Sequence, residues 1–296
     1  MRDNRSLAYI ALAGLALLWG YNWVVMKIAV QYAPPIEFAA LRMLLGAAVL
    51  FAALLATRKS LRPERPAAFF WIGLFQSGGF VALATWAVLI AGAGKVAVLS
   101  YTMPLWVAIA GWPLLGERLR TSQIAALAIA LGGIVLIVDV RQGHASLFAD
   151  VLALLAGISW AVGVILSKRV QREGTVDVLN LTTWQMLFGG IAVALIAFTV
   201  PEHPTHWTPV YIGALAYNAI GASAAAYFLW VFVLQHLPAR DASMGTLANP
   251  IVGILAAWLQ LGEVPSTSEA IGMGLVIVAL AALALQQKRV ADDEQA

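Results

Sequence analysis

The sequence consists of long apolar runs that follow one another along almost the entire chain. Each run covers about 20 residues, the length that an α-helix needs to cross the hydrocarbon core of a bilayer. Charged residues and prolines gather between the runs. The sequence therefore predicts an all-α integral membrane protein with ten transmembrane helices. They are expected at Leu7–Val30, Pro34–Thr57, Ala67–Ala91, Val96–Leu115, Ser122–Val138, Ala149–Leu166, Val178–Val200, Pro209–Gln235, Asp241–Leu261 and Glu269–Leu285.

The composition agrees with a chain that folds in lipid. Of the 296 residues, 61% are hydrophobic and 11% are charged, whereas a soluble domain is roughly half apolar and about a quarter charged. This chain has too little polar surface to cover a water-soluble globule. It also contains no cysteine, which excludes disulfides, thiolate metal sites and thiol catalysis.

The distribution of basic residues predicts the orientation. The first apolar run exceeds the 7–15 residues, approximately, of a signal peptide, so we interpret it as a retained helix. Lys and Arg favour cytoplasmic loops, and most of the 18 basic residues fall on one side when the N-terminus is placed inside. We therefore expect a multi-pass protein of the cytoplasmic (inner) membrane with both termini cytoplasmic. This bias accounts for the net charge of +3 without nucleic acid as a partner.

The two halves of the chain resemble each other. Ala16–Trp23 aligns with Ala153–Trp160, and Met43–Gly46 aligns with Met186–Gly189. The most specific match pairs Pro104 and the later Leu-Gly-Glu ending at Glu117 with Pro250 and the Leu-Gly-Glu ending at Glu263, at identical separation. Two copies of an odd number of helices insert in opposite directions, as in many secondary transporters. We expect two inverted five-helix repeats, residues 1–146 and 147–296.

These elements carry a resemblance to a known family. The doubled Pro and Leu-Gly-Glu pattern, Leu41-Arg42-Met43-Leu44-Leu45 in the second span and Leu18-Trp19-Gly20-Tyr21-Asn22-Trp23 in the first resemble the EamA family of the drug/metabolite transporter superfamily. The aromatic-rich central helices resemble the YddG-type aromatic amino-acid exporters. The resemblance implies a ten-helix, basket-like transporter with a central cavity lined by the first, third, fourth, sixth, eighth and ninth helices. One departure is Gln185, which stands where the first half has Arg42.

Polar residues inside the spans are the first candidates for a site, because unpaired polar groups in hydrocarbon cost several kcal/mol. Asn22 and Ser159 occupy matching places in the first and sixth spans, each beside a Trp. They either line a cavity and bind a substrate carboxylate or ammonium group, or form interhelical hydrogen bonds worth under about 1–2 kcal/mol per contact.

A second set of polar residues is found in the third, fourth, eighth and ninth spans. A proline inside a helix frees a carbonyl. Beside polar side chains, such a break either exposes acceptors to a cavity or is a simple kink satisfied by neighbouring Ser or Thr. The set comprises Gln76 and Ser77, Tyr217 and Asn218, Tyr101 and Thr102 before Pro104, and Asn249 before Pro250.

The sequence has 11 Trp, most of which we expect to pack in the interior or face lipid. Trp19 and Trp160 are near the Asn22 and Ser159 positions and are candidates for stacking on a flat or aromatic substrate. The complete set of predicted cavity residues is Trp19, Asn22, Gln76, Tyr101, Ser159, Trp160, Tyr217, Asn218 and Asn249.

Charged residues within the spans are few. Arg42 lies about two turns into its helix, with Glu37 nearer the surface. Arg42 either attracts a substrate carboxylate at the outer vestibule or snorkels and pairs with Glu37 or a carbonyl. Glu117 and Glu263 are interpreted as caps or gate contacts. No Asp, Glu or His lies near a predicted midplane, which favours facilitated transport, although coupling through Arg42 or a vestibule carboxylate stays open.

Together these features predict a carrier that exports amino acids, aromatic ones above all, by alternating access. The alternatives are export of other metabolites, aliphatic amino acids or drugs, with or without proton coupling. An intramembrane enzyme is disfavoured because there is no buried His, Cys or paired carboxylate and no His-Glu-x-x-His motif. A channel is disfavoured because no charged or carbonyl filter is repeated. The expected partners are a small-molecule substrate and the lipid bilayer, with no cofactor, metal, nucleic acid or obligate protein partner.

Overall fold

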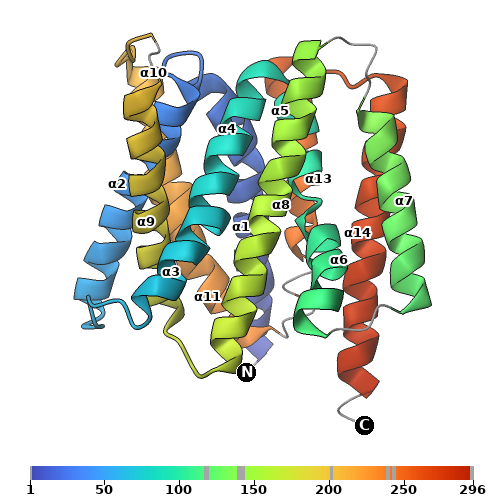
Figure 1. Cartoon of the computed structure of the whole chain (residues 1–296), viewed down its shortest axis with the longest axis horizontal. Helices are drawn as coiled ribbons and strands as arrows, with labels where there is room; N and C mark the ends of the chain where they lie inside the picture. Colours follow the sequence, from blue (N-terminus) through green and yellow to red (C-terminus); the bar gives the residue numbers. More distant parts are fainter. Residues whose placement is uncertain are drawn as a thin grey trace.

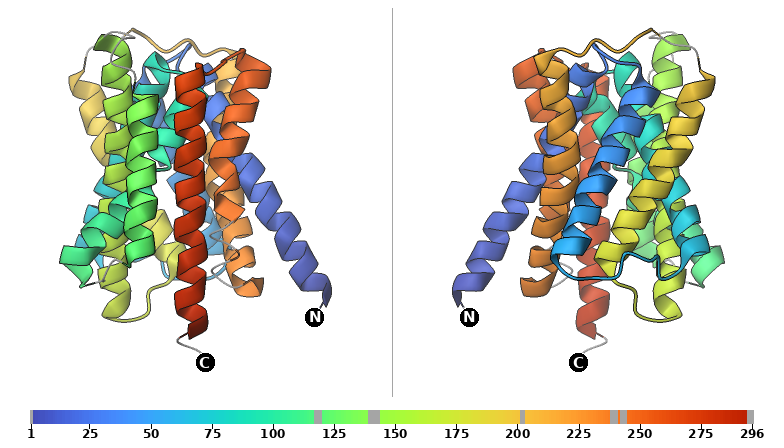
Figure 2. Two further views of the ribbon diagram at one scale, coloured as in Figure 1. Left: turned by 90° about the vertical axis from the view of Figure 1, so that its right-hand side faces the viewer. Right: turned by 90° about the vertical axis from the view of Figure 1, so that its left-hand side faces the viewer.

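The computed structural model describes residues 2–116, 120–138, 144–200, 203–237, 241 and 245–293, and every regular element within these ranges is a helix. The helices form one bundle, and α1 begins on the same side of it as α14 ends (Figure 1, Figure 2). In chain order the elements are α1 (Arg2–Ala29), α2 (Pro35–Ala56), α3 (Pro66–Ile72), η1 (Gly73–Gly79), α4 (Phe80–Ile90), α5 (Ala93–Ser100), α6 (Met103–Leu115), α7 (Thr121–Ile137), α8 (His144–Arg172), α9 (Val178–Thr199), α10 (Pro209–Ala216), η3 (Tyr217–Ala225), α11 (Ala226–His236), α13 (Ala248–Ala256), η4 (Ala257–Leu261) and α14 (Thr267–Asp293).

The helices have the length and surface of a multi-pass membrane protein. In the described ranges, eight are long and apolar enough to cross a bilayer, and two further apolar helices, Thr121–Ile137 and Ala248–Leu261, are shorter. Large apolar side chains also cover the outside of the bundle, among them Phe198 at 89% exposed and Leu259 at 78% exposed. A surface of this kind is stable only against lipid or another apolar partner.

The repeated Leu-Gly-Glu motif ends helices. Gly116 and Gly262 have φ of 72° and 67° and terminate α6 and η4, a left-handed conformation in which glycine avoids a steric penalty. The carboxylate of Glu263 then accepts a hydrogen bond from the backbone N–H of Gly94 at the start of α5, at 3.3 Å. Glu263 therefore acts as a cap, as predicted, whereas Glu117 lies outside the described residues.

Several of the predicted spans are not continuous α-helices. The third and eighth spans each contain a π-helical segment, η1 and η3, and the fourth span is divided between α5 and α6 at Tyr101 and Thr102. The α5–α6 break arises because Pro104 has no N–H to donate and excludes the preceding turn of a regular helix. The π segments have no such marker in the sequence, although π-bulges are frequent at functional sites.

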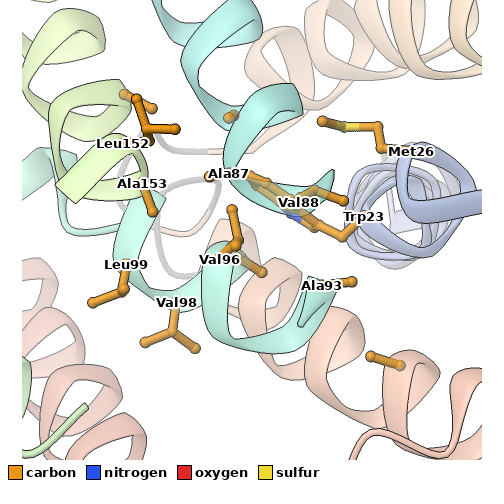
Figure 3. Close-up of a cluster of buried hydrophobic side chains, with 14 of the residues drawn as sticks. Trp23, Met26, Ala87, Val88, Ala93, Val96, Val98, Leu99, Leu152 and Ala153 are labelled. Atoms are coloured by element: carbon orange, nitrogen blue, oxygen red, sulfur yellow. The ribbon is translucent and has the colours of Figure 1, made fainter. Parts of the chain in front are cut away.

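The largest apolar cluster among the described residues joins α1, α4, α5 and α8 with α7, α10 and α14, and Figure 3 shows part of it. Trp23 and Met26 of α1 meet Ala87 and Val88 of α4 there, and every residue of α5 is buried. The contact between α7 and α14 is close. Gly133 of α7 and Gly272 of α14 leave no room for a Cβ, which would come within 2.7 Å of the facing backbone at either glycine.

Candidate functional site

A row of aromatic rings inside the bundle runs from Tyr101, at the end of α5, through α1 and α4 to α8. The ring of Trp23 lies 6.2 Å from that of Tyr101 and 6.5 Å from that of Phe80, and Phe80 packs edge-on against Trp160 at 4.8 Å. Edge-to-face pairs at these distances stabilise each other and present flat apolar faces. Of the predicted residues, Tyr101 and Trp160 belong to this row, whereas Trp23 and Phe80 were not among the candidates.

Tyr101 and Asn249 join the two broken helices directly. The Asn249 side-chain amide donates to the Tyr101 hydroxyl at 2.9 Å. Asn249 is the second residue of α13, directly before Pro250, and Tyr101 follows the last residue of α5, three residues before Pro104. The structure thus brings together two candidates from opposite halves of the chain, and it does so where both helices are interrupted.

The break before Pro104 is held by side-chain hydrogen bonds among its neighbours. The Thr102 hydroxyl donates to the Leu99 carbonyl at 2.6 Å and accepts from the Trp106 indole at 3.0 Å. This arrangement fits the simple kink that sequence reasoning left open. The break is therefore stabilised locally and needs no ligand to exist.

Three asparagines carry buried side-chain oxygens without a hydrogen-bond partner among the described residues. These are the Oδ1 atoms of Asn22, Asn218 and Asn249. Asn22 lies one turn beyond Leu18, whose carbonyl accepts from the hydroxyl of Tyr217, the neighbour of Asn218. Because an unsatisfied buried acceptor costs roughly 1–3 kcal/mol, such atoms are suited to accept from a donor that arrives with a ligand.

Arg42 has no carboxylate within ion-pair distance in the described part of the chain. Glu37 instead accepts from the Thr205 hydroxyl at 2.8 Å, so the predicted alternative of an Arg42–Glu37 pair is wrong. Phe38, one turn earlier in α2, packs on Tyr211 of α10, and Gly46, one turn later, faces Ser223 of η3. Arg42 therefore shares the face of α2 whose neighbouring residues contact α9, α10 and η3.

Four other candidates are held by neighbouring helices. The Trp19 indole donates to the Ala222 carbonyl at 3.0 Å and packs on Trp230 at 6.1 Å. The Ser159 hydroxyl donates to the Phe75 carbonyl in η1 at 2.7 Å. The remaining two bonds run from the hydroxyl of Tyr217 to the Leu18 carbonyl at 2.8 Å and from the hydroxyl of Ser167 to Gln76 at 3.3 Å. Ser159 and Asn22 therefore occupy matching sequence positions but make different contacts.

Two features of the interior were missed by sequence reasoning. Trp23 lies at the centre of the aromatic row and is 4% exposed, and the alignment of the halves already placed it opposite Trp160. Lys95, Asp150 and Glu269 form a buried ion cluster, with Lys95 Nζ 3.0 Å from Asp150 Oδ2 and 3.2 Å from Glu269 Oε1. The three lie on different helices, α5, α8 and α14, far apart in sequence, so no local pattern connects them.

Known proteins match the chain over nearly its full length. The EamA-like transporter family matches residues 6–139 and again residues 147–285. The uncharacterized transporter YoaV of Bacillus subtilis is 27% identical over 260 residues, 86% of this chain and 88% of its own length. A probable amino-acid metabolite efflux pump of Salmonella typhimurium is 27% identical over 291 residues, 94% of each chain.

A solved protein crystal structure shares the fold, with a TM-score of 0.67, 23% sequence identity and coverage of 96% of this chain and 99% of its own. The two family matches together cover most of the 296 residues. The chain therefore belongs to the EamA-like transporter family.

Proposed function

We propose that this protein is a carrier that exports amino acids across the cytoplasmic membrane by alternating access. In this proposal the helices form ten spans in two inverted repeats, both termini are cytoplasmic, and the substrate binds between α1, α2 and η3. The double family match at residues 6–139 and 147–285 supports two repeats. The excess of Lys and Arg on one side supports the orientation.

The observation that carries the substrate class is Arg42. A guanidinium without a carboxylate partner inside an apolar bundle is expensive unless it serves a ligand, and its planar fork binds a carboxylate through two parallel hydrogen bonds. The unpartnered oxygens of Asn22 and Asn218 are acceptors suited to an ammonium group. A carboxylate and an ammonium together describe an α-amino acid.

The aromatic row supports large flat side chains as the preferred cargo. Trp23, Phe80, Tyr101 and Trp160 offer ring faces and edges in one interior region, and ring pairs contribute about 0.5–1.5 kcal/mol beyond the area that they bury. We therefore propose tryptophan, phenylalanine and tyrosine as the first substrates to test. The Salmonella relative, named a probable amino-acid metabolite efflux pump, supports the wider class.

Counterflow in proteoliposomes tests this proposal. Vesicles loaded with unlabelled tryptophan, phenylalanine, tyrosine or leucine are given a trace of the same labelled compound, and tryptamine, which lacks the carboxylate, is the matched control. We expect saturable uptake of the amino acids and little uptake of tryptamine. Arg42→Gln should reduce uptake about 10- to 100-fold, the effect of losing a charged hydrogen bond of about 1.5–3 kcal/mol.

Glutamine is already present at the equivalent position of the second half, Gln185, so the substitution suits this kind of helix. Glu37→Gln, one turn away and bound to Thr205, is the control and should retain most of the uptake. Equal uptake by Arg42→Gln and the unchanged protein, or equal uptake of tryptamine and tryptophan, would contradict the proposed carboxylate site.

A further inference from the structure

The loop between α2 and α3, residues 57–65, crosses the start of α9 at the end of the bundle where α1 begins (Figure 2). The Trp184 indole of α9 donates to the Leu61 carbonyl at 3.1 Å. The Asn180 amide, one turn earlier in α9, donates to the Arg62 carbonyl at 3.0 Å. Two successive carbonyls of the loop are thus fixed on α9. The loop belongs to the first stretch of the family match and α9 to the second, so the two halves of the chain meet here.

The carboxylates of this region all have partners. Asp177 forms an ion pair with Lys59, and Glu173 forms one with Arg65. Glu64 accepts from the backbone N–H of Asp177 at 3.2 Å. The loop and the turn between α8 and α9 that it meets are described throughout, and these three are the acidic residues that they contain.

The other two basic residues of the loop, Arg58 and Arg62, are exposed and have no carboxylate within ion-pair distance in the described part of the chain. Arg58 also has a left-handed backbone, with φ of 55°. It follows α2 at a position that favours glycine, because the N–H of Lys59 bonds back to the Leu54 carbonyl at 2.9 Å. An arginine there is less stable than a glycine. Strain at a residue whose side chain the fold does not use indicates that the side chain serves a ligand.

A ladder of aromatic rings lies beside this loop. From α2 across α9 to α3 its rings are Phe51, Trp184, Phe188, Phe70 and Trp71, and successive centroids are 5.2, 5.3, 5.9 and 5.3 Å apart. Each ring lies within about three turns of the helix end that adjoins the loop. Phe70 and Trp71 are 40% and 51% exposed. Because the Trp184 indole also bonds to the loop, this aromatic ladder begins at the boundary between the polar end of the bundle and its apolar side.

We propose that an anionic phospholipid of the cytoplasmic leaflet binds here, with its phosphate between Arg58 and Arg62 and its acyl chains along the aromatic ladder. Guanidinium groups bind phosphate oxygens through charged hydrogen bonds, and basic side chains beside a span attract anionic lipids. A free phosphate would leave the exposed rings uncovered, whereas a phospholipid uses both parts of the surface. The inference rests on the proposed orientation but does not depend on the identity of the cargo.

Native mass spectrometry of the full chain in detergent tests this proposal. The protein is titrated with dioleoyl-phosphatidylglycerol, and dioleoyl-phosphatidylcholine, which has the same acyl chains and no net charge, is the matched lipid. We expect one phosphatidylglycerol to bind about 10- to 30-fold more tightly than phosphatidylcholine, as two arginines near an anionic headgroup predict. Excess inorganic phosphate should not displace it, because phosphate makes no contact with the rings.

Three substitutions assign the binding to this surface. Arg62→Gln should weaken phosphatidylglycerol binding about 5-fold. Arg58→Gly should weaken it equally and at the same time raise the melting temperature of the lipid-free protein, because glycine removes the cost of the left-handed backbone. Trp71→Ala should weaken the binding of both lipids, because it shortens the aromatic ladder.

Arg169→Gln is the matched control. Arg169 is an exposed basic residue of α8 that donates to the Leu114 carbonyl at 3.2 Å, so its substitution removes the same charge away from the aromatic ladder and should leave lipid binding unchanged. Equal binding of the two lipids, displacement by inorganic phosphate, or an equal loss in Arg169→Gln and Arg62→Gln would overturn the proposal.

Arg42→Gln distinguishes this inference from the proposed function. It should abolish amino-acid counterflow and leave phosphatidylglycerol binding unchanged, because Arg42 lies within α2 and outside the loop. Binding in detergent depends neither on transport nor on orientation. A failure of the proposed carrier function would therefore leave the lipid titration intact, and a failure of the lipid titration would leave counterflow intact.

Discussion

At the scale of single residues, the buried asparagines separate into two kinds. Asn180 is fully engaged: its amide donates to the carbonyls of Ser60 and Arg62 at 2.8 and 3.0 Å, and its oxygen accepts from the N–H of Glu64. Asn22 donates only to the sulfur of Met26, at 3.3 Å, and its oxygen has no partner among the described residues. Asn180 therefore stabilises the fold, whereas Asn22 is kept at a cost that substrate binding can offset.

This difference predicts opposite effects of two similar substitutions. Asn22→Leu should raise the melting temperature of the substrate-free protein, because it removes an unsatisfied acceptor worth about 1–3 kcal/mol, while it impairs counterflow. Asn180→Leu should lower the melting temperature by breaking three hydrogen bonds. Thermal unfolding in detergent, beside counterflow in vesicles, checks both. A loss of stability for Asn22→Leu with normal transport would show that Asn22 is structural.

Asp177 provides a prediction on pH. Burial alone would raise the pKa of this carboxyl group, but hydrogen bonds from the Lys59 ammonium and from the N–H of Asn180 outweigh burial and lower it. A lowered pKa stabilises the folded protein above the ordinary value of about 3.9, and the stabilisation is lost as the pH falls further. Asp177 also caps α9.

Asp177→Asn should therefore destabilise the protein by about 1 kcal/mol at pH 7, as loss of a charged cap and its pair does. The difference from the unchanged protein should shrink below about pH 4. Thermal unfolding at pH 7 and pH 3.5 measures it. Glu173→Gln, which removes a more exposed pair with Arg65, should change little at either pH. A constant difference across this range would exclude the Lys59 pair as its cause.

The types of the interior residues could be read from the sequence, but their partners could not. The polar positions stood out because polar side chains are rare within apolar runs. Whether Ser159 meets a ligand or the Phe75 carbonyl depends on which helix lies opposite, and that information is spread over the entire chain. The Lys95 cluster was missed for the same reason, since its members appeared as unrelated charges near span ends.

At the scale of elements, the close contact of α7 and α14 gives glycine a specific role. The sequence contains Gly132-Gly133 and Gly272-x-Gly274, which allow close packing without naming the partner. The structure pairs Gly133 with Gly272, and a Cβ on Gly272 would lie 2.5 Å from the Gly133 carbonyl oxygen. Gly132 and Gly274 have nothing within 4 Å of their added Cβ. One glycine of each pair is needed for packing and the other is not.

Gly272→Ala should therefore lower the stability by about 1–3 kcal/mol, because the two backbones must separate to admit the methyl group. Gly274→Ala, two residues away on the same helix, should be neutral or slightly stabilising through its better helix propensity. Melting temperatures of the two variants in the same detergent measure the contrast. Equal melting temperatures would contradict the close approach of α7 and α14.

The sequence predicted where most helices lie, and it predicted both proline breaks, because long apolar runs, prolines and glycines are local signals. It did not predict the π segments η1, η3 and η4. A π turn changes only the hydrogen-bond register of a helix and leaves the pattern of apolar residues nearly intact. The contacts of a π segment with its neighbouring helix, such as that of Gln76 in η1 with Gly163 of α8, are also absent from the local sequence.

At the scale of the whole molecule, the orientation in the membrane is open to a simple measurement. The loop between α2 and α3 lies on the side of the bundle where α1 begins, and the loop before α10 lies on the other (Figure 1). His203→Cys and Ser60→Cys place single thiols in these two loops, and both positions are exposed. A membrane-impermeant maleimide applied to intact cells should label His203→Cys but not Ser60→Cys. The reverse pattern would invert the assigned topology.

The two ends of the molecule also carry corresponding contacts. Asp241 and Lys95 hold matching positions, because each lies the same number of residues before its proline, Pro250 or Pro104. Ser146 and Tyr9 also match, because each lies the same number of residues before its tryptophan, Trp160 or Trp23. The Tyr9 hydroxyl donates to Asp241 at 2.9 Å, and Lys95 lies 3.5 Å from the Ser146 hydroxyl. Matching positions of the two halves thus meet at both ends of the bundle, with opposite charge.

The Tyr101–Asn249 hydrogen bond joins the end of α5 to the start of α13 and can act as a pivot between these two helices. Lys95 is six residues from this pivot, a lever arm of about 9 Å at about 1.5 Å per residue, so a tilt of about 15° displaces it by about 2 Å. That movement would separate an ammonium and a carboxylate now 3.0 Å apart while the helix stays intact. Under the proposed alternating access, a small rotation of this short segment is therefore enough to break the contact between Lys95 and Asp150.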